Sequence, residues 1–186
     1  MPDLKISVKL SYSVDKDRSG YISTDELQQA LSNGTWNPFN PETVRLMIGM
    51  FDKENRGVIS FNDFGTLWKY VSDWQNCFRS FDTDSSGNID SKELKNALNA
   101  FGYRLPDDTA DMMVRKFDRY GQGTILFDDF IQCCVTLYVS IRFISYYSES
   151  VTRYLGGRQP ACRVQLKSGT AVPSFPRSSS DHFRPL

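Results

Sequence analysis

The sequence contains little of the chemistry that most enzymes and zinc proteins need. His182 is the one histidine among 186 residues, and no nucleophile–base pair is apparent, so we expect no enzymatic activity. The spacing of the four cysteines is typical of neither a zinc site nor a disulfide framework: Cys77, Cys133, Cys134 and Cys162. That usage favours a reducing compartment, and the start of the chain has no signal-peptide pattern, so we expect a cytoplasmic protein.

Acidic side chains are scarce in the last quarter of the chain, and long apolar runs are missing throughout. Residues 137–186 hold seven Lys or Arg but only Glu149 and Asp181, whereas residues 1–136 hold 15 basic and 20 acidic side chains, a net charge of −5. An acidic body suits a cation binder and argues against nucleic acid. The most apolar run, residues 135–147, is interrupted by Arg142 and by serines, so we expect no membrane span.

Residues 82–93, DTDSSGNIDSKE, carry oxygen ligands at a regular spacing. Loop positions 1, 3, 5, 7, 9 and 12 are Asp82, Asp84, Ser86, Asn88, Asp90 and Glu93. Asn88 would offer its backbone carbonyl, and Glu93 would close the shell with both carboxylate oxygens. Gly87, at position 6, permits the positive φ of a sharp turn. The pattern predicts an EF-hand loop that binds Ca²⁺.

A second complete loop occupies residues 15–26, DKDRSGYISTDE. Its predicted ligands, at positions 1, 3, 5, 7 and 12, are Asp15, Asp17, Ser19, Tyr21 through its carbonyl, and Glu26. The repeat indicates that the chain is built from helix-loop-helix hands, numbered below by their loops.

Two further copies lack part of this ligand pattern, and we call them the eroded loops. Residues 52–63 place Arg56 at position 5, and residues 118–129 place Tyr120 at position 3; both end in aspartate, Asp63 or Asp129, in place of glutamate. Aspartate is one methylene shorter, which weakens bidentate closure around Ca²⁺ and makes Mg²⁺ comparatively less disfavoured. We therefore expect hands two and four to be structural partners of hands one and three, with Mg²⁺ as the ion that these weak sites would take.

The intervals between loops predict an all-α fold of two EF-hand pairs joined by one shared helix. Loops begin at 15, 52, 82 and 118, and only residues 64–81 separate loop two from loop three. This stretch has a helical period and no Gly or Pro after Gly65, so one continuous helix is expected. The isoleucines at position 8 are expected to pair the loops through short strands: Ile22 with Ile59, and Ile89 with Ile125.

These features resemble the penta-EF-hand family. The resemblance covers roughly residues 14–134 and includes the stretches DKDRSGYIS, WKYVSDWQN, ELKNALNAFGYRL and RKFDRYGQG. It implies a calcium-sensing adaptor, with Ca²⁺ at hands one and three, that exposes an apolar groove for Pro- and Tyr-rich segments. The implied partners are proteins of endosomal sorting and vesicle coats, with links to apoptosis. It also implies membrane association through partners, and endosomal, endoplasmic reticulum or nuclear pools.

Aromatic side chains suit such a groove because flat rings bind extended, proline-rich segments. The predicted partner-binding residues are Trp68, Tyr70, Trp74, Phe101, Tyr103 and Arg104. The alternative is that these rings fill the core, which the helical spacing favours for Phe78 and Phe81. For the other side chains, the groove is what the resemblance implies.

Both ends depart from the family pattern. Residues 6–14 alternate apolar and polar, which predicts a strand where hand one needs a helix; hand one should therefore bind Ca²⁺ more weakly than hand three. No ligand pattern of a fifth hand follows loop four, so dimerisation through a fifth hand is in doubt.

We thus divide the chain into 1–14, four hands over 15–136, an atypical apolar segment 137–155, and a basic tail 156–186 expected to be disordered. Within the apolar segment, residues 138–147 fit a helix, an edge strand or an aggregating stretch.

Two other functions compete with the adaptor. One is a calcium or magnesium buffer that does not open, as in some EF-hand proteins. The other is a regulatory subunit of a calpain-type protease, which the resemblance also allows. Loss of partner binding with a chelator would support the adaptor, and unchanged apolar-dye binding on adding Ca²⁺ would support the buffer.

Overall fold

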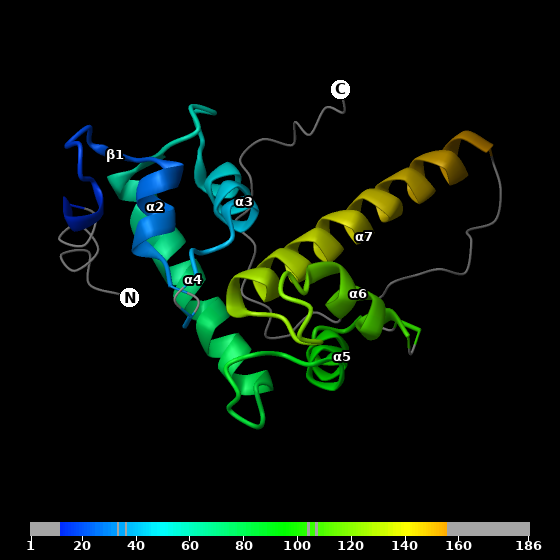
Figure 1. Ribbon diagram of the computed structural model, residues 1–186. Helices are drawn as coiled ribbons and strands as arrows, with labels where there is room; N and C mark the ends of the chain where they lie inside the picture. Colours follow the sequence, from blue (N-terminus) through cyan, green and yellow to red (C-terminus); the bar gives the residue numbers. More distant parts are fainter. Residues whose placement is uncertain (1–11, 33, 36, 104, 107, 156–186) are drawn as a thin grey trace. The chain divides into compact units, whose positions relative to one another are not determined.

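The structure, a computed structural model, describes residues 12–155 except 33, 36, 104 and 107, and gives only the backbone of 145–155. Its elements are β1 (Tyr21–Ile22), α2 (Thr24–Ala30), α3 (Pro41–Phe51), β2 (Ile59–Ser60), α4 (Phe61–Phe81), α5 (Ser91–Ala100), α6 (Thr109–Phe117) and α7 (Phe127–Leu155). The predicted all-α class is confirmed, with helices in every hand (Figure 1). The basic tail, residues 156–186, lies outside the described residues.

The chain divides into two units, the first reaching Cys77 and the second beginning at Phe78. In the first unit α2 packs against α3; in the second, α6 packs against both α5 and α7. The predicted shared helix is confirmed as α4, which runs unbroken from loop two into loop three. Among the helices that the structure describes, none is long and apolar enough to cross a membrane.

The two predicted loop pairings are confirmed. β1 and β2 are antiparallel, with Ile22 opposite Ile59. Ile89 and Ile125 form the equivalent antiparallel bridge in the second unit. All four isoleucines are at most 1% exposed, because the β-branched side chains turn inward between the helices. Each pair of loops is therefore tied at its midpoint by both backbone and side chains.

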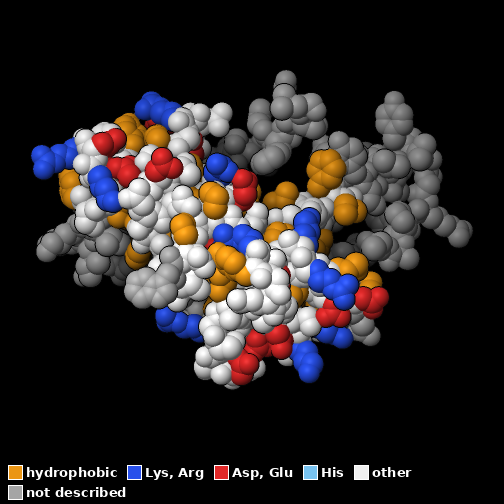
Figure 2. Space-filling view, viewed as in Figure 1, with side chains coloured by type: hydrophobic (Ala, Val, Ile, Leu, Met, Phe, Trp, Pro, Cys, Tyr) orange, Lys and Arg blue, Asp and Glu red, His pale blue; other side chains and the backbone are white. Residues whose placement is uncertain are grey.

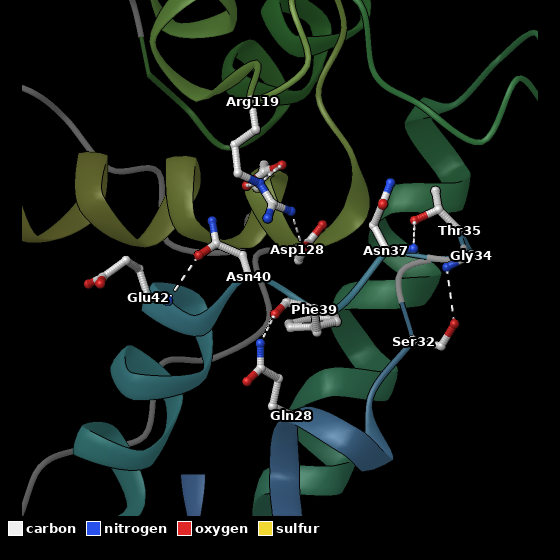
Figure 3. A network of polar contacts seen from close by, with 11 residues as sticks. Gln28, Ser32, Gly34, Thr35, Asn37, Phe39, Asn40, Glu42, Arg119 and Asp128 are labelled. Carbon is white, nitrogen blue, oxygen red and sulfur yellow. Dashed lines mark hydrogen bonds and ion pairs between the residues drawn. The ribbon is translucent and has the colours of Figure 1, made fainter. Parts of the chain in front are cut away.

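Helix starts follow their capping residues. Asn40 caps α3 by accepting a hydrogen bond from the Glu42 amide at 2.9 Å, with Pro41 in the first turn (Figure 3). Ser23 and Asp90 open α2 and α5 through capping boxes, in which Glu26 and Glu93 reach back to the capping residue. The last ligand of each complete loop is thus also a structural residue of the helix that follows.

The strand prediction for residues 6–14 is wrong where the structure describes it. Residues 12–14 are helical, and residues 6–11 lie outside the described part. Val14 is 7% exposed, and the Tyr12 ring meets the Phe61 ring edge-on at 5.0 Å. Packing against the first unit outweighs a short alternating pattern, because tertiary contacts override local periodicity.

The segment after loop four is helical, which decides among the three alternatives for residues 138–147. α7 continues without interruption from Phe127 to Leu155. Its first half is buried, including Phe130, Ile131 and Cys133, whereas Val139, Phe143 and Ile144 are 50–65% exposed. Apolar side chains are visible along this helix in Figure 2. Within residues 130–155, the described helix contains no loop that would make a fifth hand.

Candidate calcium centres

In loop three, backbone amides hold the carboxylates close together. Asp82 accepts hydrogen bonds from the Ser86 amide at 2.9 Å and the Gly87 amide at 3.0 Å, and Asp84 accepts from the Ser86 amide at 2.9 Å. Gly87 has φ +81°, the left-handed conformation that allows its amide to turn toward Asp82. The acidic side chains over the loop that follows α4 are visible in Figure 2.

The closing glutamate of loop three is fixed from two sides. One oxygen of Glu93 accepts from the Thr83 amide at 2.7 Å and the Thr83 hydroxyl at 2.8 Å. The other accepts from the Asp90 amide at 3.2 Å. Glu93 is 6% exposed, so the carboxylate points into the loop and away from solvent. Sequence reasoning missed Thr83, and a hydroxyl directly after the first aspartate is the signal that would have found it.

Loop one repeats this geometry closely. Asp15 accepts from the Ser19 and Gly20 amides, both at 3.0 Å, and Asp17 accepts from the Ser19 amide at 2.9 Å. Glu26 accepts from the Lys16 amide at 2.8 Å. The Ser19 hydroxyl lies 3.2 Å from the Tyr21 carbonyl oxygen, one of the predicted ligands, and Ser86 has the same relation to Asn88 in loop three.

Three carboxylates of the complete loops, Asp17, Glu26 and Asp84, have a lowered pKa and so favour the ionised form. Hydrogen bonds from the side chain and then the backbone of Ser19 lower the pKa of Asp17, and those of Ser86 do the same for Asp84. Burial acts to raise the pKa of Glu26, but the hydrogen bonds from Ser23 and from the Lys16 amide outweigh it and lower that pKa. Charged oxygen ligands are therefore available at neutral pH.

Three of the four carboxylates of each complete loop lie close together. Oxygens of Asp15, Asp17 and Glu26 all lie within 4.8 Å of one another, as do those of Asp82, Asp84 and Glu93. Such clusters of hard oxygens fit Ca²⁺, which prefers carboxylates and carbonyls. No comparable group of His, Cys, Asp or Glu side chains occurs elsewhere among residues whose side chains the structure describes. The remaining predicted ligand, Asp90, caps α5 by accepting from the Glu93 amide at 2.8 Å.

In the eroded loops, a basic side chain of the same loop forms an ion pair with the carboxylate at position 12. Lys53 forms an ion pair with Asp63 in loop two, and Arg119 contacts Asp129 in loop four at 2.9 Å. Arg56, at position 5 of loop two, pairs with Glu54 at 2.8 Å. Weak Mg²⁺ binding at these two loops stays a prediction.

Most of the predicted partner-binding residues are buried. Tyr70, Trp74, Phe101 and Tyr103 are at most 5% exposed, whereas Trp68 is partly exposed. Arg104 lies outside the described residues. Burial also raises the pKa of Tyr103 to about 12. Access to these four rings requires a change in packing, and their role in partner binding stays a prediction.

The fold and the two carboxylate clusters define a calcium-binding protein of paired EF-hands. The EF-hand domain pair family matches residues 12–69 and 71–134. Sorcin from Schistosoma japonicum is 52% identical over 134 residues, which are 72% of this chain and 78% of that sorcin. Human peflin is 44% identical over 128 residues, 68% of this chain and 45% of peflin.

A solved structure agrees with these relatives. A homologue of programmed cell death 6 protein from Leishmania major Friedlin aligns with TM-score 0.67 and 32% identity, covering 78% of this chain and 83% of that one. The chain belongs to the penta-EF-hand family, as the sequence resemblance implied. It spans less than two thirds of several relatives, such as 62% of human sorcin.

Proposed function

We propose that the protein is a calcium-sensing adaptor in which Ca²⁺ at hands one and three exposes apolar surface for Pro- and Tyr-rich partner segments. The supporting observation is that Glu93 belongs both to the carboxylate cluster of loop three and to the capping box that starts α5. Ca²⁺ supplies the positive charge that draws the carboxylates together. The proposed partners act in endosomal sorting, vesicle coats and apoptosis-linked signalling, and we place the protein in the cytoplasm.

A chain of contacts leads from Glu93 to aromatic rings. α5 begins two residues before Glu93 and ends at Ala100, where Phe101 caps it through a hydrogen bond to the Ala97 carbonyl. The Phe101 ring meets the Phe81 ring of α4 edge-on at 5.7 Å. A shift of Glu93 would therefore move α5 and change the packing of Phe101. Such a link between an ion site and buried rings is what a sensor requires.

Peptide binding in the presence and absence of a chelator tests this proposal. A fluorescein-labelled peptide rich in Pro and Tyr should bind with Ca²⁺ and dissociate when EGTA is added. A scrambled peptide with the prolines replaced by serine is the matched control, because it keeps length and charge but loses the extended conformation. Equal binding with and without Ca²⁺ would contradict the sensor role.

One observation favours the buffer that does not open. Four of the six proposed partner residues are buried, and Trp74 is fully so. A buffer would bind Ca²⁺ at hands one and three with no change in apolar surface. Fluorescence of an apolar dye separates the two functions, since the adaptor should increase it on Ca²⁺ addition and the buffer should leave it unchanged.

A further inference from the structure

The last carboxylate of each loop is held by the second residue of the same loop, in two different ways. In loops one and three, the backbone amides of Lys16 and Thr83 donate to Glu26 and Glu93. In loops two and four, side chains take over this role, because Lys53 and Arg119 pair with the closing aspartates. The chain therefore supplies its own cation only where the closing residue is aspartate.

Lys16 shows that a basic second residue is not enough. Its ammonium group bonds to Gln29, outside the loop, while its backbone amide holds Glu26. Glutamate reaches the backbone amide of the second residue; in loop four the shorter Asp129 is instead reached by the Arg119 side chain. A loop that ends in glutamate thus keeps a cluster of carboxylate oxygens without a cation of the chain, whereas a loop that ends in aspartate forms an ion pair with its own second residue.

The loop-four ion pair is the more deeply buried of the two. Arg119 Nη2 lies 2.5 Å from Asp128, and Arg119 Nε lies 2.9 Å from Asp129. The side chains of these aspartates are 0% and 2% exposed (Figure 3 shows Arg119 reaching Asp128). Two carboxylates in such surroundings need a compensating cation, and a planar guanidinium can serve both at once. In loop two, by contrast, Lys53 and Asp63 are 65% and 21% exposed.

The electrostatics agree with the geometry. Burial opposes the charge on Arg119, but the hydrogen bond to Asp129 and the charges of Asp128 and Asp129 outweigh it and raise the Arg119 pKa. Arg119 is therefore positively charged at neutral pH, with its charge favoured by the two aspartates.

Loop four is directly tied to loop three. The Gly123 amide donates to Asp118 at 2.6 Å, which closes the turn, and two residues later Ile125 exchanges backbone hydrogen bonds with Ile89. Ile89 lies between Asn88 and Asp90, two predicted ligands of hand three. The conformation of loop four thus affects the middle of loop three, the neighbouring calcium loop, through these hydrogen bonds.

We propose that Arg119 is the resident cation of hand four and that, by closing this loop, it sets the calcium affinity of hand three. Arg119 is a positioning residue, since it acts through Asp128, Asp129 and the Ile89–Ile125 bridge. The inference rests on the proposed calcium binding at hand three. It implies that the pair formed by hands three and four needs only one divalent ion.

Calcium titration of Arg119→Met, followed by the amide resonances of the loop glycines, tests the proposal. Gly87 and Gly20 report hands three and one, because their amides bond to Asp82 and Asp15. Methionine keeps the apolar stem but removes the charge, so hand three should lose roughly tenfold in calcium affinity while hand one is unchanged. Arg119→Lys should restore part of the loss, since it keeps the charge but lacks the fork.

Lys53→Met is the matched control in the other unit. Because the Lys53–Asp63 pair is exposed, its removal should change the affinity of hand one by less than about twofold. If Arg119→Met does not fold, Arg119→Lys alone carries the test, with an intermediate loss at hand three expected.

Three results separate the possible failures. A wild-type protein in which Gly87 does not respond to Ca²⁺ would overturn the proposed function itself. A responsive wild type with unchanged hand-three affinity in Arg119→Met, or in Arg119→Lys if only that variant folds, would overturn this inference alone. An Arg119→Met protein that gains an ion at hand four, reported by Gly123, and keeps its hand-three affinity would also overturn it.

Discussion

Ile89 and Ile125 exchange both of their backbone hydrogen bonds, each with an N···O distance of 2.9 Å. Their side chains are 0% and 1% exposed, so the same two residues join loops three and four through backbone and core. This bridge joins the complete loop directly to its eroded neighbour. Any change in the order of loop four should reach the ligands of loop three through it.

Shortening Ile125 should weaken both stability and calcium binding. Ile125→Ala leaves a cavity in a site that is 1% exposed, and we expect the free energy of unfolding to fall by about 2–5 kcal/mol. Calcium affinity at hand three should also fall, because Ile125 no longer packs against Ile89. Urea unfolding and calcium titration measure the two effects. Val139→Ala, at a position 50% exposed on α7, is the control that should change neither.

Hand one should bind Ca²⁺ more weakly than hand three. Both clusters have the same geometry, but residues 6–14 before loop one alternate apolar and polar side chains and so lack a continuous apolar helix face, and Tyr12 is 67% exposed. The 21-residue α4 leads into loop three. Ordering a loop costs less when the flanking helix is already packed. Titration followed at Gly20 and Gly87 compares the sites, and equal affinities would contradict the prediction.

Two tryptophans of α4 should behave differently when truncated. Trp74 is 0% exposed, so Trp74→Ala should lower the free energy of unfolding by about 3–5 kcal/mol. Trp68 is partly exposed, and Trp68→Ala should have a smaller effect on stability but should weaken peptide binding in Ca²⁺. Unfolding curves and peptide titrations on both variants check this. A Trp68→Ala protein with wild-type peptide affinity would remove Trp68 from the proposed partner surface.

The cysteines should differ in reactivity toward iodoacetamide. Burial raises the pKa of Cys133 to about 12 and that of half-buried Cys77 to about 11. The thiolate is the reactive form, and it is populated only as the pH approaches the pKa. At a given pH below both values, Cys77 should therefore react faster than Cys133, which is also 0% exposed in the native protein. Mass spectrometry of tryptic peptides measures the ratio, and in urea the two rates should become similar.

Loop chemistry and helix boundaries were accessible from the sequence because they depend on local spacing. The clustering of carboxylates in loops one and three and the continuous α4 both follow from residues close together in the chain. The helical conformation of residues 12–14 could not be predicted from local spacing, because it depends on contacts such as that of Tyr12 with Phe61. The ion pairs of Arg119 with Asp128 and Asp129 could not be predicted either, since residue spacing does not show the direction of a long side chain.

The number of tightly bound calcium ions tests the central claim most directly. Native mass spectrometry of the wild type should show two Ca²⁺ per chain, and Glu26→Gln or Glu93→Gln should each remove one, because the amide keeps the shape but loses the charge. The double variant should show none. Asp63→Asn serves as the control, because the Lys53–Asp63 pair of loop two is exposed, and it should leave the count at two. Four ions in the wild type, or two retained in the double variant, would contradict the account.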